Sequence, residues 1–170
     1  AIRENNIDYI IAEAIGQEEK CVDMLDVNVG LPEIDEKIFL PNVIKEIQAV
    51  TTLPLQIDTS NKEALENAMR IYNGKPLVNS VNGEQESMDS VFPLVKKYGG
   101  AVIALTLDKN GIPSTAYERF EIAKRIVHEA AKYGIDKKDI IVDTLCLTVS
   151  SDKEAPTVTL QAMKMIKEKL

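Results

Sequence analysis

The sequence predicts an α/β fold in which parallel strands alternate with helices. Five short apolar, β-branched runs recur along the chain, and segments with helical periodicity separate them. A repeated strand–helix order joins parallel strands by right-handed crossovers. Polar residues end nearly every run, as they do at the mouth of a (β/α)8 barrel, where the carboxyl ends of all strands meet. The sequence therefore favours a TIM-type (β/α)8 barrel over an open doubly wound sheet, whose polar residues gather at one switch point.

Each predicted strand is a short run bounded by polar residues or turn signals. The runs cover residues 24–29, 53–57, 76–81, 101–107 and 140–147. Five strands and six helices fall short of a full barrel, which takes about 250 residues. We therefore expect one domain over residues 1–170, an incomplete barrel section of about strands two to six that lacks the first strand and the last two βα units.

Each predicted helix carries an apolar stripe at helical spacing. In the second helix, Pro41 predicts a kink or a late start. Capping-box patterns begin the third helix at Ser60-Asn61-Lys62-Glu63 and the fifth at Thr115-Ala116-Tyr117-Glu118, and Gly99-Gly100 ends the fourth. The stripes are, in chain order, Ile7, Ile10, Ile11, Ala14 and Ile15; Ile38, Val43, Ile44 and Ile47; Ala64, Leu65, Ala68 and Met69; Met88, Val91, Phe92 and Val95; Ile122, Ala123, Ile126 and Val127; and Val158, Ala162, Met163 and Ile166.

Composition excludes several classes of function. The chain has 27 acidic and 20 basic residues, a formal charge of −7, which argues against nucleic acid or an anionic membrane as a partner. No apolar run approaches the roughly 18 residues of a membrane span, and no signal peptide opens the chain. Cys21 and Cys146 lie far apart and read as structural residues, Cys146 within a strand, so we expect a cytoplasmic protein. His128 is the only histidine, which excludes a Ser-His-Asp triad within this chain, and we expect it to face solvent or to be partly packed rather than catalytic.

The polar strand ends form the candidate site. Period-two alternation places Asp26 and Asn28 on one face of their strand, and Asp58, Asn79 and Asp143 end three later strands. Such a set supplies hydrogen-bond acceptors and donors with almost no positive charge, which suits a flat neutral heterocycle such as a pterin. We expect no metal, although Asp26, Asp58 and Asp143 also fit a divalent cation, and any single Asp here also fits a helix cap. Two loop motifs are typical of tight turns, Asn82-Gly83 and Asp108-Lys109-Asn110-Gly111.

Five motifs in a fixed order carry a family resemblance that extends over essentially the whole chain. Together they resemble the pterin-binding domain of methyltetrahydrofolate:corrinoid methyltransferases, a family that includes the folate domain of cobalamin-dependent methionine synthase. The motifs are Leu25-Asp26-Val27-Asn28-Val29-Gly30, Gln56-Ile57-Asp58-Thr59-Ser60-Asn61, Val78-Asn79-Ser80-Val81-Asn82, Leu105-Thr106-Leu107-Asp108-Lys109-Asn110-Gly111-Ile112-Pro113 and Ile141-Val142-Asp143.

The resemblance implies a (β/α)8 barrel enzyme that moves the methyl group of methyltetrahydrofolate to a Co(I) corrinoid on another domain or protein. It implies that Asp58, Asn79 and Asp143 hold the pterin ring, with Asn28 and Asp26 supporting them. The family's further Asn, beside the methyl-bearing nitrogen, belongs to a seventh strand that this sequence lacks, so no catalytic residue is assigned. The partners implied are a folate and a corrinoid-binding domain or protein, and the open edges of the section would suit a homodimer.

The sequence departs from the family pattern twice, at Thr144, where the family usually has Pro, and at Gly83, where members have Ala. Three alternatives stay open. A dihydropteroate synthase-like pterin enzyme would show a Gly-rich pattern with a following Ser-Thr-Arg-Pro stretch, whereas Asn28-Val29-Gly30-Leu31-Pro32 stands here. A corrinoid methyltransferase with a methylated-amine donor and a non-catalytic pterin-binding module are the other two.

Overall fold

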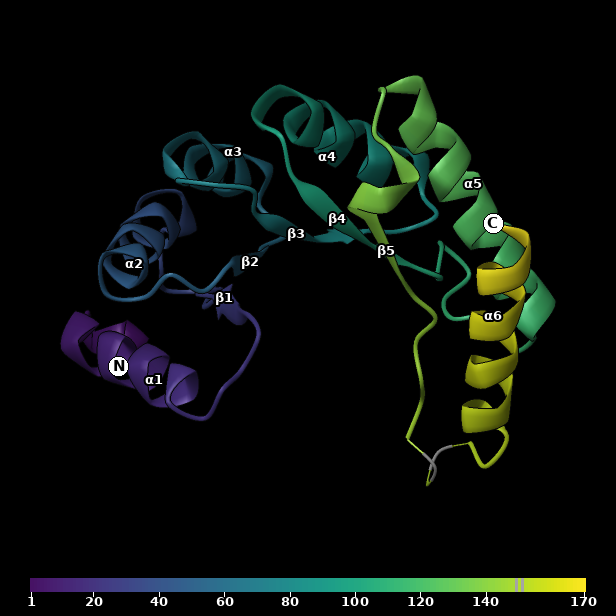
Figure 1. The fold of residues 1–170 in the computed structure, drawn as a ribbon, viewed down its shortest axis with the longest axis horizontal. Coiled ribbons are helices and arrows are strands. Elements are labelled where there is room, and N and C mark those ends of the chain that lie inside the picture. The colour runs from purple at the N-terminus through teal and green to yellow at the C-terminus, as the bar shows by residue number, and fades with distance from the viewer. Residues whose placement is uncertain (149, 151) are drawn as a thin grey trace. The chain divides into compact units, whose positions relative to one another are not determined.

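The computed structural model describes residues 1–148, 150 and 152–170. Within them, five parallel strands alternate with six α-helices, and the strands form one sheet in the order β1-β2-β3-β4-β5 (Figure 1). The predicted α/β fold is confirmed. The strands are β1 (Leu25–Asn28), β2 (Leu55–Asp58), β3 (Leu77–Val81), β4 (Ala101–Leu105) and β5 (Ile140–Asp143); the helices are α1 (Ile7–Glu18), α2 (Glu36–Val50), α3 (Lys62–Ile71), α4 (Gln85–Tyr98), α5 (Ala116–Lys132) and α6 (Ala155–Lys169), with short 3-10 helices η1 (Ile2–Glu4) and η2 (Lys137–Asp139).

The chain divides into two compact units. The first comprises Ala1–Asn79 and Lys97–Ala101, and the second comprises Ser80–Lys96 and Val102–Leu170. In the first unit, β1 pairs with β2 and β2 with β3, all parallel, while α2 packs on α1 and α3. Alternate residues of β1 and β2 are buried, as a strand with one covered face requires. The fully buried core of this unit consists of Leu40, Ile44, Leu55, Ile57, Ala64, Ala68 and Val78.

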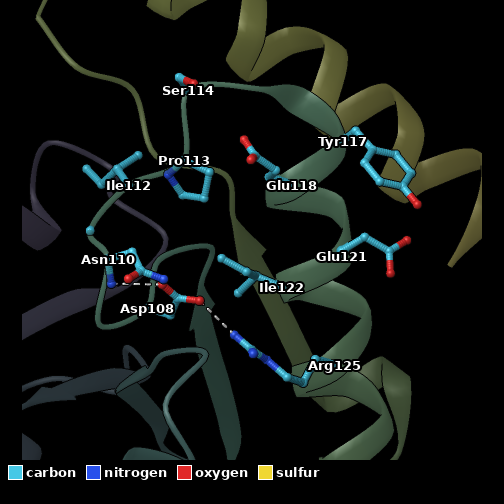
Figure 2. Close-up of a pocket in the computed structure, with 11 residues that line it drawn as sticks. Asp108, Asn110, Ile112, Pro113, Ser114, Tyr117, Glu118, Glu121, Ile122 and Arg125 are labelled. Atoms are coloured by element: carbon cyan, nitrogen blue, oxygen red, sulfur yellow. Dashed lines mark hydrogen bonds and ion pairs between the residues drawn. The ribbon is translucent and has the colours of Figure 1, made fainter.

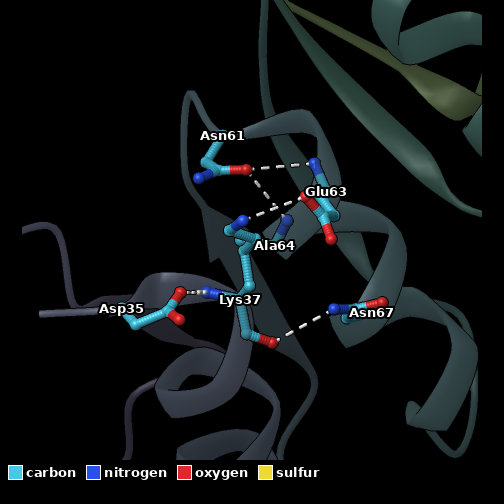
Figure 3. Close-up of polar contacts among 6 residues, drawn as sticks. All are labelled: Asp35, Lys37, Asn61, Glu63, Ala64 and Asn67. Atoms are coloured by element: carbon cyan, nitrogen blue, oxygen red, sulfur yellow. Dashed lines mark hydrogen bonds and ion pairs between the residues drawn. The ribbon is translucent and has the colours of Figure 1, made fainter.

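Helix α3 begins one residue later than the capping-box pattern predicts. The side chain of Asn61, rather than that of Ser60, is the N-cap and accepts hydrogen bonds from the backbone N–H groups of Glu63 (3.0 Å) and Ala64 (3.1 Å; Figure 3). Asn and Ser cap helices about equally well, so the sequence alone cannot rank two adjacent candidates. The predicted cap at Ser60 is therefore wrong by one position.

Helix α2 runs through Pro41 because a neighbouring helix replaces the hydrogen bond that proline removes. The Asp35 side chain caps the helix by accepting from the Lys37 backbone N–H over 3.1 Å, so the predicted late start is wrong. Proline has no N–H to offer the carbonyl of Lys37, four residues earlier. The Nδ2 of Asn67, on α3, donates to that carbonyl over 3.1 Å, and Lys37 Nζ pairs with Glu63 Oε2 at 3.2 Å (Figure 3).

In the second unit, β4 and β5 pair in parallel and α5 packs beside α6. Thr115 caps α5 as predicted, accepting from the backbone N–H of Glu118. Gly99, which follows α4 and belongs to the first unit, adopts a left-handed conformation that suits glycine. The predicted turn at Asp108 closes through two backbone hydrogen bonds with Gly111. The fully buried apolar core consists of Val81, Phe92, Val102, Ala104, Ala123, Ile126, Ala130, Ala155 and Ala162.

Gly83 lies where the backbone after β3 packs closely against α5. Its N–H donates to the carbonyl of Leu107 over 2.8 Å, which draws its backbone against the end of β4. A Cβ atom here would lie 2.8 Å from Ile122 Cγ2 and 2.5 Å from the Nη2 of Arg125. A side chain at this position would force Ile122 and Arg125 on α5 to shift, so the close approach of α5 favours glycine.

Several sequence predictions fail at the edges of elements. Strand β5 ends at Asp143, so Cys146 lies outside it and is exposed rather than packed in the core. Cys21 is also exposed, with a positive φ of 61°. Ile38 and Met163, predicted on inner stripes, are 69% and 52% exposed because they flank the buried face rather than lie on it. His128 is exposed, as expected. No helix in the described ranges has the length and apolar character of a membrane span.

Candidate functional site

The first unit places three of the predicted site residues in one row across its strands. In the parallel register, Asn28 is opposite Asp58, and Asp58 is opposite Asn79. The Nδ2 of Asn28 donates to Asp58 Oδ2 over 2.8 Å. A second row lies two residues earlier, where Asp26 is opposite Gln56 and accepts a hydrogen bond from its side-chain amide. Carboxylates and carboxamides thus alternate at the carboxyl ends of β1, β2 and β3.

The orientation of the Asn28 amide is set by the chain that follows it. Its Oδ1 accepts the backbone N–H of Gly30 over 2.8 Å, so its Nδ2 is the atom left to face Asp58. A Cβ at Gly30 would lie 3.3 Å from that Oδ1, a tighter approach than most side chains tolerate. Gly30 therefore lets the loop fold back on Asn28 and hold its donor on the carboxylate.

Asp58 is also supported from the residue after it. Thr59 Oγ1 donates to Glu36 Oε2 over 2.5 Å and accepts the backbone N–H of Asn61 over 3.0 Å. These contacts fasten the end of β2 to the first turn of α2 and to the cap of α3. The sequence assigned no role to Glu36, and Gln56 stood only within the second family motif, two residues before Asp58 and so on the same face of its strand. The signal for Gln56 was that alternation, whereas Glu36 had none, because its partner is distant in sequence.

Asp26 has a perturbed acidity. Partial burial raises the pKa of the Asp26 carboxyl above its usual value, the hydrogen bond from Gln56 lowers it, and the charge of Asp58 raises it again. The net direction is upward, so Asp26 holds its proton more readily than a free aspartate. Asp26 and Asp58 lie in adjacent rows and repel each other when both are charged, and protonation of Asp26 relieves that repulsion.

Asp143 lies in the second unit, at the carboxyl end of β5 and opposite Leu105 of β4. Its backbone carbonyl accepts the N–H of Thr106 over 3.0 Å, and its Oδ1 accepts the N–H of Leu145 over 2.7 Å. Its side chain is exposed. The structure therefore brings Asp26, Asn28, Asp58 and Asn79 together in the first unit and places Asp143 at a strand end of the second.

A pocket of about 680 Å³ lies in the second unit between the β4–α5 loop and α5 (Figure 2). Arg125 Nη2 pairs with Asp108 Oδ2 at 3.1 Å along its wall. The backbone N–H of Asn110 and the guanidinium of Arg125 hold the pKa of Asp108 below its usual value. None of the five predicted site residues lines this pocket. Within the described residues, no cluster of three His, Cys, Asp or Glu side chains is arranged to hold a metal ion.

The parallel sheet with acidic and amide residues at its strand ends defines the class of protein. The family model described as pterin binding enzyme matches residues 1–170, and the chain belongs to that family. Among curated relatives, it is 31% identical over 158 residues to the methylcorrinoid:tetrahydrofolate methyltransferase of Eubacterium limosum, covering 91% of this chain and 58% of that protein. It is 26% identical over 172 residues to the methionine synthase of Mycobacterium tuberculosis, covering 89% of this chain and 14% of that protein.

Solved structures confirm the barrel class. The dihydropteroate synthase of Stenotrophomonas maltophilia superposes with a TM-score of 0.72 at 17% identity, over 94% of this chain and 64% of that chain. The dihydropteroate synthase of Xanthomonas albilineans in complex with 7,8-dihydropteroate superposes with a TM-score of 0.67 at 18% identity, over 95% of this chain and 61% of that chain. At such identities the likeness concerns the fold alone. The chain is an α/β section of a TIM-type barrel in the pterin-binding family, with methyltransferase relatives, and it spans less than two thirds of each of these proteins.

Proposed function

We propose that this protein binds methyltetrahydrofolate through its pterin ring and transfers the methyl group to a Co(I) corrinoid carried on another domain or protein. The observation that carries the proposal is the row Asn28–Asp58–Asn79, in which an oriented amide already donates to the central carboxylate. The methyltransferase relatives support the reaction class. Residues 1–170 would form part of the pterin-binding barrel, about strands two to six, and further strands would complete the mouth.

The proposed ligands complement the hydrogen-bonding groups of a pterin edge. Its amino-pyrimidinone edge presents two adjacent N–H donors, which one carboxylate can accept side by side. Asp58 receives one hydrogen bond from Asn28 and keeps lone pairs on both oxygens for these donors. Asn79, with one acceptor and one donor group, serves the remaining ring atoms. Asp143 completes the set, and Asn28 and Asp26 support it.

Methyl transfer from a tertiary amine requires help at the leaving nitrogen. A corrinoid on the partner would supply the nucleophile, and the leaving nitrogen would have to gain a proton or a hydrogen bond as its bond to the methyl carbon breaks. The side chains of this chain contribute by fixing the pterin on rigid strand ends, so that the methyl group stays exposed to the partner. No covalent bond to the protein is needed. Both cysteines are exposed free thiols, which fits a reducing compartment, and we place the reaction in the cytoplasm.

The test is calorimetric titration of methyltetrahydrofolate into the full-length protein, followed by addition of Co(I) cobalamin and absorbance detection of methyl transfer. Asp58→Asn is expected to weaken binding by about 1–3 kcal/mol, because it replaces a double acceptor with a donor on one side. Asp136→Asn, at an exposed position before η2, is the matched control.

Each alternative has its own outcome. Binding without methyl transfer would leave a pterin-binding module. Formation of dihydropteroate would identify a synthase, and transfer from a methylated amine alone would identify a different donor. No binding of methyltetrahydrofolate to the unsubstituted protein would overturn the proposal.

A further inference from the structure

Arg119 is a charged side chain in the core of the second unit. It is 1% exposed and lies on the inner face of α5, in line with the buried residues Ala116, Ala123 and Ile126. Burial of a guanidinium is costly unless its N–H groups find acceptors. A buried arginine therefore needs a structural or functional role that offsets the free energy of its desolvation.

The acceptors of Arg119 are neutral oxygens from three separate segments. Nε donates to the carbonyl of Pro113 over 2.9 Å. Nη1 lies 2.9 Å from the carbonyl of Thr144, 2.7 Å from that of Leu145 and 3.1 Å from Thr159 Oγ1. One guanidinium thus joins the β4–α5 loop, the loop after β5 and helix α6. Two of its acceptors, including the nearest at 2.7 Å, belong to Thr144 and Leu145, the residues that directly follow Asp143.

The loop held by Arg119 is strained. Leu145 has a φ of 57°, in the left-handed region that non-glycine residues seldom occupy. Its N–H donates to Asp143 Oδ1 over 2.7 Å, while its carbonyl accepts from Arg119 and lies 2.7 Å from Thr159 Oγ1. The single proton of that hydroxyl also has the carbonyl of Ala155 within 2.8 Å. The two ends of the Leu145 residue are therefore fixed by opposite partners: a buried cation and hydroxyl on one side, and the carboxylate of Asp143 on the other.

We propose that Arg119 is a positioning residue that sets the orientation of the Asp143 carboxylate through the backbone of Leu145. The proposal rests on the proposed function, in which Asp143 holds the pterin. Because Arg119 holds the Leu145 carbonyl, the Leu145 N–H stays in place to donate to one oxygen of Asp143. That hydrogen bond then sets the rotamer of the Asp143 side chain. Without that hold, Leu145 relaxes from its left-handed conformation and the carboxylate loses its directing donor.

The experiment is a double-mutant cycle on the full-length protein. Arg119→Lys keeps the charge but loses the planar set of donors that reaches several carbonyls. It is expected to raise the Kd for methyltetrahydrofolate about tenfold. In an Asp143→Ala background it is expected to leave the Kd unchanged, because its effect passes through Asp143. Arg125→Lys, on the exposed side of the same helix, is the matched control and should bind normally.

Thr159→Val provides a second route if Arg119→Lys does not fold. It removes the hydroxyl that is shared between the carbonyls of Leu145 and Ala155, and it is expected to raise the Kd about threefold, again only while Asp143 is present. Amide hydrogen exchange of Leu145 without ligand gives a readout independent of binding. We expect its N–H to exchange faster in Arg119→Lys and at the unsubstituted rate in Arg125→Lys.

The outcomes separate the two proposals. An equal loss of affinity with and without Asp143, or unchanged affinity with unchanged exchange at Leu145, would overturn the role of Arg119. Failure of the unsubstituted protein to bind methyltetrahydrofolate would overturn the proposed function instead. The exchange rate of Leu145 would then still decide whether Arg119 holds the loop.

Discussion

Asn28 donates to Asp58 across neighbouring strands over 2.8 Å, and the loop that follows Asn28 fixes which end of its amide does so. The carboxylate of Asp58 is therefore oriented before any ligand arrives. Preorganised acceptors bind more tightly than mobile ones, because less rotational freedom is lost on binding.

Asn28→Ala is expected to weaken methyltetrahydrofolate binding by about 1 kcal/mol, because it releases the Asp58 carboxylate from its directing donor. Isothermal titration of the variant against the unsubstituted protein measures the change. Asn42→Ala, on the exposed face of α2, is the control and should bind with unchanged affinity. Equal affinity in both variants would remove Asn28 from the site.

Asp143→Ala is expected to cost about 1–3 kcal/mol of pterin affinity, because pterin N–H donors would be left without an acceptor. Asp143→Asn keeps an oxygen for the Leu145 N–H and separates the two roles of this carboxylate. It should preserve the loop and still lose affinity. Fluorescence or calorimetric titration of both variants provides the measurement, and an unchanged Kd in Asp143→Ala would contradict the assignment.

The raised pKa of Asp26 predicts a pH dependence of folding stability. The folded state holds this proton more strongly than the unfolded chain, so the free energy of unfolding falls as pH rises from the ordinary Asp value, about 3.9, through the raised one. Asp26→Asn should remove this fall. Urea titrations at a series of pH values measure the change. The free energy of unfolding of the variant, relative to that of the unsubstituted protein, should grow with pH through that window and then stay constant.

Asp108→Asn provides the comparison of opposite sign for that experiment. Its lowered pKa gives a stabilisation that is present above the ordinary Asp value and lost as pH falls through the lowered value. The substitution should therefore lower stability at neutral pH and have no effect in acid. A pH profile for Asp26→Asn that parallels the unsubstituted protein would contradict the raised pKa.

Gly83→Ala is expected to destabilise the protein by about 1–3 kcal/mol, because the added methyl group would collide with α5. Gly16→Ala, within α1 and with open space around it, should instead stabilise by about 0.5–1 kcal/mol through helix propensity. Urea denaturation of the two variants measures both effects. Two changes of the same sign would show that the packing around Gly83 yields easily.

Much of the fold was predictable because hydrophobic periodicity is local. The five strands, the six helices and the Thr115 cap all follow from residues within one turn or one strand of each other. The shared face of Asp26 and Asn28 follows from strand alternation alone. The alignment of Asn28 with Asp58 does not, because cross-strand register depends on how separate segments pack.

The sequence-based predictions are wrong where the local structure depends on contacts with residues far away in the sequence. Residues 144–147 look like a strand in sequence, but the chain leaves the sheet after Asp143 because Leu145 adopts a left-handed conformation held by Arg119. The importance of Arg119 was hidden for the same reason, since its partners are mainly backbone carbonyls of other segments. An arginine on the inner register of an amphipathic helix was the one available signal.

The buried turn at Gly83 also governs how this protein ages chemically. Asn-Gly sequences deamidate when the glycine nitrogen attacks the asparagine side-chain carbonyl. Here the N–H of Gly83 is engaged with Leu107, and Asn82 Oδ1 accepts the N–H of Glu84 over 2.8 Å. Attack requires both hydrogen bonds to open, so we expect Asn82 to convert to aspartate and isoaspartate in storage only as often as this part of the second unit opens locally.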